Sequence, residues 1–366
     1  AGKSVTAPNS LQTLSRQTLG FESSKYGTVK EILPLIITLK KPNPKVIVIV
    51  GPTASGKTDL AIRLAQKFNG EIISADSRQV YSGMDIGTAK PKLIRRGKFL
   101  YYQNIRHHLM NIRKISQSFS AADFKNLAEK AVRDITTRGK LPLVVGGTGL
   151  YVKALVENLN LAATPVDLRL RRKLERELKT EGLAHLFSKL TGLDPEAAYV
   201  VDPKNPRRVI RAFEIALAGK KPLGRSQTRT GGRPLFNFLE IGIDVPREEL
   251  KKKIKARVRA MMTGGLVDEV KKLIRDHDKN PEPLSAIGYR EVIDYLKGKI
   301  SLDQAMRHIQ TNTWRYAKKL IAWFKKDPRV RWIKTKPEAE RLIKAFIRLP
   351  FKKIKQFAEP PKKKNI

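Results

Sequence analysis

The feature that most constrains this 366-residue sequence is a glycine-rich loop between an apolar run and a helical pattern. Residues 46–50 are all Val or Ile, which is typical of a strand buried on both faces. Residues 51–58 read G-P-T-A-S-G-K-T, and apolar residues at helical spacing follow from Leu60 to Phe68. In such a strand–loop–helix unit, backbone N–H groups surround phosphate oxygens at the positive end of a helix dipole. The sequence therefore predicts a di- or triphosphate site rather than a simple glycine-rich turn.

Two side chains of this phosphate-binding loop (P-loop) have distinct expected roles. Lys57 is expected to place its charge on the outer phosphate, and the Thr58 hydroxyl is expected to bind Mg²⁺. The residues expected to contact the phosphates are Gly51, Thr53, Ala54, Ser55, Gly56, Lys57 and Thr58.

The segment that would complete an ATP-hydrolysing site is different in this chain. P-loop ATPases usually end a neighbouring strand in an Asp that holds Mg²⁺. Here the buried run at residues 141–145 leads into G-G-T-G-L-Y, so Gly146 takes that position, and the N-K-x-D element of guanine-binding GTPases is missing from the sequence. We therefore expect phosphate binding without the switch of a nucleotide hydrolase.

The charge of the chain points to a polyanionic partner. Lys and Arg number 74 against 34 Asp and Glu, a formal charge of +40, while 41% of residues are hydrophobic, as in a folded protein. Nucleic acid is the leading candidate partner. The absence of cysteine excludes disulfides, thiolate zinc sites and thiol nucleophiles. No apolar run approaches the ~20 residues of a membrane span.

The order of predicted elements indicates an α/β fold with a P-loop NTPase-like parallel sheet core and a helical insertion domain. Strands are expected at residues 46–50, 71–75, 141–145 and 238–243, with helices between and after them. The predicted organisation is an N-terminal extension, a catalytic core in two segments, an Arg-rich helical insertion and a mobile basic tail. These parts are residues 1–44, residues 45–165 with 236–335, residues 166–235 and residues 336–366.

Asp76 follows the second predicted strand, with Ser77, Arg78 and Gln79 next to it. In open α/β sheets the carboxyl ends of the strands face the ligand crevice, so Asp76 is expected to point towards the P-loop. The alternative is an Asp that only caps a helix.

Three arginines in the predicted insertion, Arg207, Arg208 and Arg211, can share part of one helical face. A charged helical face is often simply solvated. Because few acidic residues offset these arginines, we favour contact with RNA phosphates.

Together these motifs resemble the tRNA dimethylallyltransferases over roughly residues 45–333. The matching segments are G-P-T-A-S-G-K-T-D-L-A, I-S-A-D-S-R-Q-V-Y-S-G-M-D-I-G-T-A-K-P, F-S-A-A-D-F, P-L-V-V-G-G-T-G-L-Y, N-P-R-R-V-I-R-A-F-E, G-L-V-D-E-V, A-I-G-Y-R-E and R-Y-A-K-K-L-I-A-W-F. This family transfers a dimethylallyl group from its diphosphate to the exocyclic amine of the adenosine just 3′ of the anticodon. Its fold is a P-loop α/β core with a helical insertion that grips the anticodon stem.

The resemblance implies roles for individual residues. Asp76 would take the proton of the adenine amine, Thr148 would touch the target nucleotide, and Arg257 would lie near the diphosphate bound by the P-loop with Mg²⁺. The residues implied to contact tRNA are Asp76, Ser77, Arg78, Gln79, Arg169, Arg207, Arg208, Val209, Ile210, Arg211, Ser285, Ala286, Ile287, Gly288, Tyr289 and Arg290. Residues that would hold the prenyl tail remain unassigned.

The chain departs from the family pattern at Asn111, which replaces an Asp, and at Lys253, where Arg is common. The preceding pair, His107 and His108, is expected to be structural or RNA-facing rather than metal-binding. Without cysteine there is no zinc finger of the eukaryotic type, so a bacterial-type enzyme is expected. A cytoplasmic location is also expected, and the size of a tRNA substrate favours a monomer. The alternatives are a P-loop small-molecule or nucleotide kinase and a non-catalytic tRNA-binding protein.

Overall fold

The computed structural model describes residues 43–161, 167–218, 232–277 and 281–350. The predicted extension, apart from residues 43 and 44, and the end of the predicted tail from residue 351 lie outside these residues.

One eight-stranded sheet runs through the described core in the order β3-β4-β5-β2-β6-β1-β7-β8. Strands β5, β2, β6, β1, β7 and β8 pair in parallel, whereas β3, β4 and β5 pair antiparallel at one edge. Their bounds are β1 (Lys45–Val50), β2 (Gly70–Ser74), β3 (Ile94–Arg96), β4 (Phe99–Tyr102), β5 (Ile105–His108), β6 (Leu141–Val145), β7 (Asn237–Ile243) and β8 (Arg331–Ile333). The four strands predicted from sequence are confirmed to within one residue, and β3, β4, β5 and β8 were missed.

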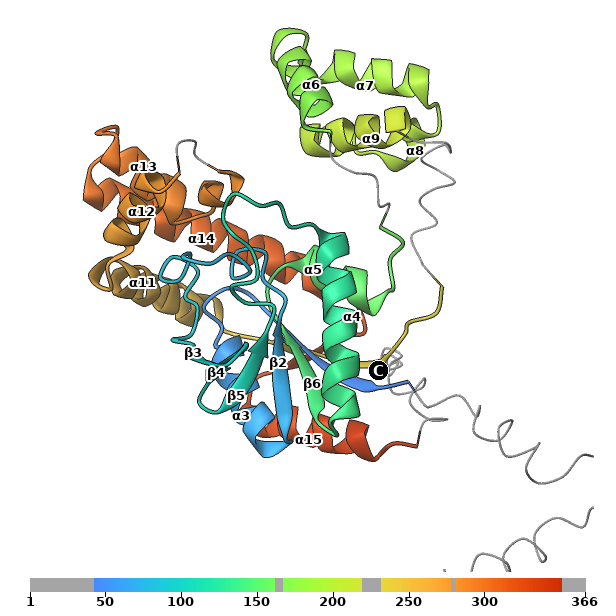
Figure 1. The fold of residues 1–366 in the computed structure, drawn as a ribbon, viewed down its shortest axis with the longest axis vertical. Helices are drawn as coiled ribbons and strands as arrows, with labels where there is room; N and C mark the ends of the chain where they lie inside the picture. Colours follow the sequence, from blue (N-terminus) through green and yellow to red (C-terminus); the bar gives the residue numbers. More distant parts are fainter. Residues whose placement is uncertain (1–42, 162–166, 219–231, 278–280, 351–366) are drawn as a thin grey trace, which may run out of the picture. The chain divides into compact units, whose positions relative to one another are not determined.

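Strand β1 is apolar from Val46 to Val50 because helices cover both faces of the sheet. Val46, Val48 and Val50 pack on the side of α4 (Ala121–Thr137), α5 (Gly149–Val156) and α14 (Leu302–Lys325). Ile47 and Ile49 pack on the opposite side, against α3 (Lys57–Lys67) and α15 (Lys336–Arg348). Figure 1 shows α4 lying along β6 and β2. This arrangement explains why the sequence lacks polar alternation at this strand.

The remaining core helices form a helical layer of their own. They are α11 (Arg247–Thr263), α12 (Leu266–Arg275), the 3₁₀ turn η1 (Glu282–Ser285) and α13 (Tyr289–Leu296), which pack with α14. Their shared apolar cluster includes Val80 and Met84, from the loop that follows β2. The loop after β2 is therefore held between the sheet and these helices.

Helix α15 corrects the prediction that residues 336–366 form a mobile basic tail. Ala339, Ile343 and Phe346 lie on one face of α15 and are completely buried in the cluster that contains β1. Lys67 of α3 also forms an ion pair with Glu340. The sequence prediction was wrong over residues 336–348 because it weighed the density of basic residues and overlooked the apolar face between them.

The described residues of the Arg-rich segment form α6 (Leu168–Thr180), α7 (Gly182–Leu193), α8 (Ala197–Val200) and α9 (Pro206–Ala218). These helices have a separate apolar cluster that includes Leu174, Leu186 and Phe213. The buried Glu214 carboxylate accepts hydrogen bonds from Arg171 and Arg211, which ties α6 to α9. The segment thus has its own packed core.

Candidate active site

A cavity of about 550 Å³ lies at the carboxyl ends of the central parallel strands. The P-loop forms one wall, and Asp76 and Gly146 follow β2 and β6 into the same space. Helices α11 and α14 contribute Arg257 and Tyr316. A parallel sheet gathers the ends of its strands at one edge, so residues far apart in sequence meet here.

The P-loop has the backbone conformation that its glycines predict. Gly56, in the left-handed region with φ of 84°, precedes the first residue of α3. Thr53, Ala54, Ser55, Gly56, Lys57 and Thr58 all line the cavity, whereas Gly51 lies behind them. The Ser55 hydroxyl is buried and has no hydrogen-bond partner among the described residues. A hydroxyl in that position is a ready donor for a phosphate oxygen.

Lys57 turns back onto its own loop, where its Nζ donates to the carbonyls of Gly51 (3.0 Å) and Pro52 (2.6 Å). Burial, reinforced by the charge of Arg257, lowers the pKa of Lys57 to about 7, and Asp76 opposes this shift. An anion entering the cavity would favour the charged form. Protonation of Lys57 is therefore coupled to anion binding.

Asp76 lies in the cavity and also stabilises the turn that follows β2. Its Oδ1 accepts hydrogen bonds from the backbone N–H groups of Arg78 (2.8 Å) and Gln79 (3.3 Å), so it caps the turn after β2. The same carboxylate lines the cavity. Within the described part of the chain its hydrogen bonds use Oδ1, which leaves Oδ2 to accept a proton.

Thr148 lies next to Asp76 because the glycine loop after β6 packs directly on the end of β2. The Thr148 Oγ1 accepts from the backbone N–H of Ser77 (2.9 Å), and its own N–H donates to the Ala75 carbonyl (3.2 Å). A Cβ on Gly146 would lie 2.1 Å from the Ala75 carbonyl oxygen. This close approach is why glycine occupies the position at which ATPases carry an Asp.

Arg257 reaches the cavity from α11 and is partly buried. Its Nη2 donates to the Thr88 carbonyl at 3.3 Å. Burial lowers the pKa of Arg257, and the Asp76 carboxylate opposes that shift. The cavity thus contains two partly buried cationic groups, Lys57 and Arg257, and the charge of Asp76 acts on the pKa of both. Lys253, one helical turn earlier, also lines the cavity and pairs with Glu249 at 2.6 Å.

The structure separates the predicted RNA contacts into exposed and buried residues. Arg169, Arg207 and Arg208 are exposed on α6 and α9. In contrast, the side chains of Val209, Ile210 and Tyr289 are buried in apolar clusters. Helical periodicity turns these three side chains into the core, so the predicted contact with RNA would have to use their backbone.

The other predicted contacts occupy varied surroundings. Arg78 forms a two-pronged ion pair with Glu282, at 2.9 and 3.0 Å. Arg290 is half exposed and pairs with Glu291 at 2.7 Å. Ala286 and Ile287 pack partly into the helical layer, and Ser285 and Gly288 flank them in the same turn.

Of the two adjacent histidines, His108 belongs to a network of charged side chains around Glu71. His108 Nε2 lies 2.8 Å from Glu71 Oε2, and Glu71 also pairs with Arg138 and Lys140. Burial alone would raise the pKa of Glu71, but hydrogen bonds from these three partners outweigh it and hold the pKa well below its usual range. The described residues contain no group of three metal-ligating side chains.

His107 lines the apolar end of the cavity with Ile72, Tyr102 and Met110, a region for which the sequence offered no assignment. Its Nδ1 lies 2.9 Å from the Ile105 carbonyl. The departure at Asn111 has a local explanation, since its Oδ1 accepts a hydrogen bond from Lys90. An amide oxygen can accept this hydrogen bond in the same way as the carboxylate oxygen of an Asp.

Sequence reasoning missed Glu269, whose carboxylate holds the loop at residues 85–87. The segment G-L-V-D-E-V carried the only signal for it. A carboxylate in the first turn of a helix is ordinarily explained by the helix dipole, so sequence alone offers no further role. No helix in the described part of the chain is long and apolar enough to cross a membrane.

These features are those of a P-loop enzyme of the transferase class: the P-loop and the Asp76 carboxylate line one cavity, and glycine stands where the hydrolases carry a magnesium-binding Asp. The sequence model of the IPP transferase family matches residues 79–327. The chain therefore belongs to the IPP transferase family.

Individual relatives agree with this assignment. The chain is 45% identical to the tRNA dimethylallyltransferase of Acetivibrio thermocellus over 290 residues, covering 79% of this chain and 91% of the relative. It is 42% identical to that of Geobacter sulfurreducens over 295 residues, with coverage of 79% and 91%. Among solved structures, the tRNA isopentenylpyrophosphate transferase of Bacillus halodurans superposes with a TM-score of 0.60 at 39% identity, covering 85% of this chain and 98% of that one. A eukaryotic dimethylallyltransferase acting on tRNA gives 0.61 at 31% identity, with coverage of 76% and 69%.

Proposed function

We propose that this protein transfers a dimethylallyl group from dimethylallyl diphosphate to the exocyclic N6 amine of the adenosine 3′-adjacent to the tRNA anticodon. Diphosphate is the second product. The observation that carries the proposal is the cavity that joins the P-loop, Lys57 and Arg257 to the Asp76 carboxylate. Membership of the IPP transferase family supports the same reaction.

The chemistry requires two kinds of assistance. The adenine amine is a weak nucleophile because its lone pair is delocalised, and the allylic carbon becomes reactive when diphosphate can leave. The N6–carbon bond forms as the carbon–oxygen bond to diphosphate breaks, and the amine proton passes to Asp76. The loop N–H groups, Lys57 and Arg257 stabilise the negative charge that develops on the leaving diphosphate.

The P-loop also fits a magnesium ion. The Thr58 hydroxyl lines the cavity beside the place proposed for the phosphates. Mg²⁺ commonly uses one or two protein oxygens together with substrate phosphates and water, so the small number of protein oxygens here suits it. When bound, Mg²⁺ would neutralise charge on the diphosphate, and Thr58 is its proposed protein ligand.

For the RNA we propose contacts from two regions. Arg169, Arg207 and Arg208 would bind phosphates of the anticodon stem from the helical insertion, residues 166–235. Near the cavity, Arg78 and Thr148 would contact the loop nucleotides that surround the target base. The target base must leave the loop stack to reach Asp76, as in other enzymes that act on a base. We propose a cytoplasmic location, because tRNA is available there.

Two alternatives are not favoured. A kinase would use ATP as its phosphate donor, but Gly146 packs against Ala75 at the position where P-loop ATPases carry the Asp that holds Mg²⁺. A non-catalytic RNA-binding protein would have no use for a partly buried Lys57 and Arg257 beside a carboxylate.

The direct test is incubation of the protein with radiolabelled dimethylallyl diphosphate, Mg²⁺ and bulk tRNA, with ATP hydrolysis measured in parallel. Label should enter tRNA, and nuclease digestion should recover it on the adenosine next to the anticodon. Consumption of ATP without labelled RNA would refute the proposal and favour the kinase.

A further inference from the structure

The loop that follows Met84 is held by a single carboxylate on a distant helix. Glu269 of α12 accepts hydrogen bonds from three consecutive backbone N–H groups. Its Oε2 accepts from Asp85 (3.0 Å) and Ile86 (2.7 Å), and its Oε1 accepts from Gly87 (3.1 Å). Successive backbone N–H groups that converge in this way form an anion-binding concavity, and here a carboxylate of the chain itself occupies it.

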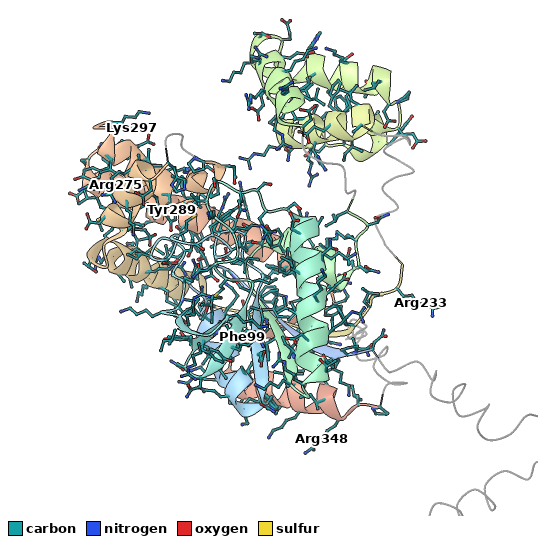
Figure 2. The ribbon with its side chains drawn as sticks, in the orientation of Figure 1. Phe99, Arg233, Arg275, Tyr289, Lys297 and Arg348 are labelled. Carbon is teal, nitrogen blue, oxygen red and sulfur yellow. The ribbon has the colours of Figure 1, made fainter. Side chains whose placement is uncertain are left out.

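Tyr289 fixes the carboxylate from behind. Its hydroxyl donates to Glu269 Oε1 at 2.7 Å, and the ring is completely buried in the helical layer. Figure 2 labels Tyr289 among the side chains of these helices. A Cβ on Gly87 would lie 2.4 Å from the Tyr289 ring, so the loop is pressed directly onto it. Glu269, Tyr289 and Gly87 therefore form one close-packed unit.

The next residue of the loop, Thr88, connects this anchored segment to the cavity. Thr88 and Ala89 line the cavity, and the Thr88 carbonyl accepts the hydrogen bond from Arg257 Nη2. The same carbonyl lies 3.4 Å from Gln79 Nε2. The peptide that follows Gly87 thus sets the direction of the Arg257 guanidinium.

We propose that Glu269 is a positioning residue for the transfer reaction. By holding residues 85–87, it places the Thr88 carbonyl so that Arg257 presents its remaining N–H groups to the diphosphate. The inference rests on the proposed function, because it assigns the diphosphate to Arg257. Glu269 itself is not among the residues that line the cavity.

The variant Glu269→Gln isolates this role. A glutamine keeps the size of the side chain but replaces one acceptor oxygen with an N–H donor, which opposes the loop N–H groups. The matched control is Asp268→Asn, which changes the same charge one residue earlier. Asp268 is 84% exposed and lies no closer than 3.8 Å to its partner Lys271.

The experiment is a double-mutant cycle on the full chain. Affinity for dimethylallyl diphosphate is measured by calorimetry for wild type, Glu269→Gln, Arg257→Gln and the double variant. Glu269→Gln should weaken affinity about tenfold, the range typical of residues that orient a binding group. In the Arg257→Gln background the same change should cost less than about twofold, because its effect passes through Arg257. Asp268→Asn should leave affinity unchanged.

The outcomes separate this inference from the proposed function. If Arg257→Gln alone leaves affinity unchanged, the proposed placement of the diphosphate fails. If Arg257→Gln weakens binding but Glu269→Gln has no effect, or an effect that adds fully in the double variant, the positioning role is overturned and the proposed function stands. Should Glu269→Gln fail to fold in thermal melts, Tyr289→Phe replaces it in the same cycle, since it removes one donor to the carboxylate and keeps the charge.

Discussion

The partly buried Lys57 predicts an unusual pH dependence of substrate binding. Its pKa of about 7 in the free protein means that about half of the molecules carry the charge at pH 7 and about one in a hundred at pH 9. A bound diphosphate stabilises the charged form and raises the pKa of Lys57. If the complex requires the charged lysine, affinity for dimethylallyl diphosphate falls about tenfold per pH unit above pH 7, or about 50-fold between pH 7 and pH 9.

Few other groups in the cavity can mimic this effect. Burial lowers the pKa of His107, so this residue takes up no proton between pH 7 and pH 9. A terminal phosphate with a second pKa of about 6 is already ionised in this range. The titration above pH 7 should therefore belong to Lys57.

The assay is calorimetric titration with dimethylallyl diphosphate, without tRNA, at several pH values and in buffers of different ionisation enthalpy. Wild type should take up about half a proton per ligand at pH 7. The matched variant Lys57→Arg keeps a charge that does not titrate, so its affinity should be nearly flat from pH 7 to pH 9. A flat profile for the wild type, or the same slope in Lys57→Arg, would refute the reasoning.

Three further predictions follow from single side chains. Asp76→Ala should lower the single-turnover rate by about 10²–10⁴-fold and leave tRNA affinity within a few fold, measured by rapid quench and filter binding; a fully active variant would exclude Asp76 as the base. Gly146→Ala should destabilise the fold by about 1–3 kcal/mol in urea titrations, because its Cβ would lie 2.1 Å from a backbone oxygen, whereas Gly147→Ala should change little because its nearest contact is 3.4 Å. Phe346→Ala should lower the free energy of unfolding by about 3–5 kcal/mol, and Ile347→Ala, at a residue that is 38% exposed, should lower it much less. Equal and small effects of the two variants would show that α15 is a loose tail.

Local features of the site were predictable from sequence to a useful degree. The P-loop, the ends of β1, β2 and β6, and the place of Asp76 after β2 all follow from short-range patterns. Asp76 also shows the limit of such patterns. Its capping role and its position in the cavity were alternatives in the sequence, and the structure shows both.

Predictions based on charge were less reliable. Basic residues are frequent in α9, where Arg207 and Arg208 are exposed, and in α15, which buries an apolar face. Charge density alone therefore could not distinguish an exposed helical surface from a helix packed on the core. Val209, Ile210 and Tyr289 stand in segments implied to contact RNA, yet packing turns their side chains inward. The short edge strand β3 was missed because its residues are all exposed and show no apolar alternation.

The sequence by itself determined the phosphate-binding loop and the strands beside it, because backbone sterics and hydrogen bonds between near neighbours are enough to specify them. Only the tertiary structure decided which distant residues complete the site. Arg257 comes from α11, more than 160 residues beyond the Thr88 carbonyl that orients it, and Glu269 lies 182 residues beyond Gly87. Such contacts depend on how the helices pack against the sheet. A contact between two distant residues leaves no periodic pattern in the sequence around either of them.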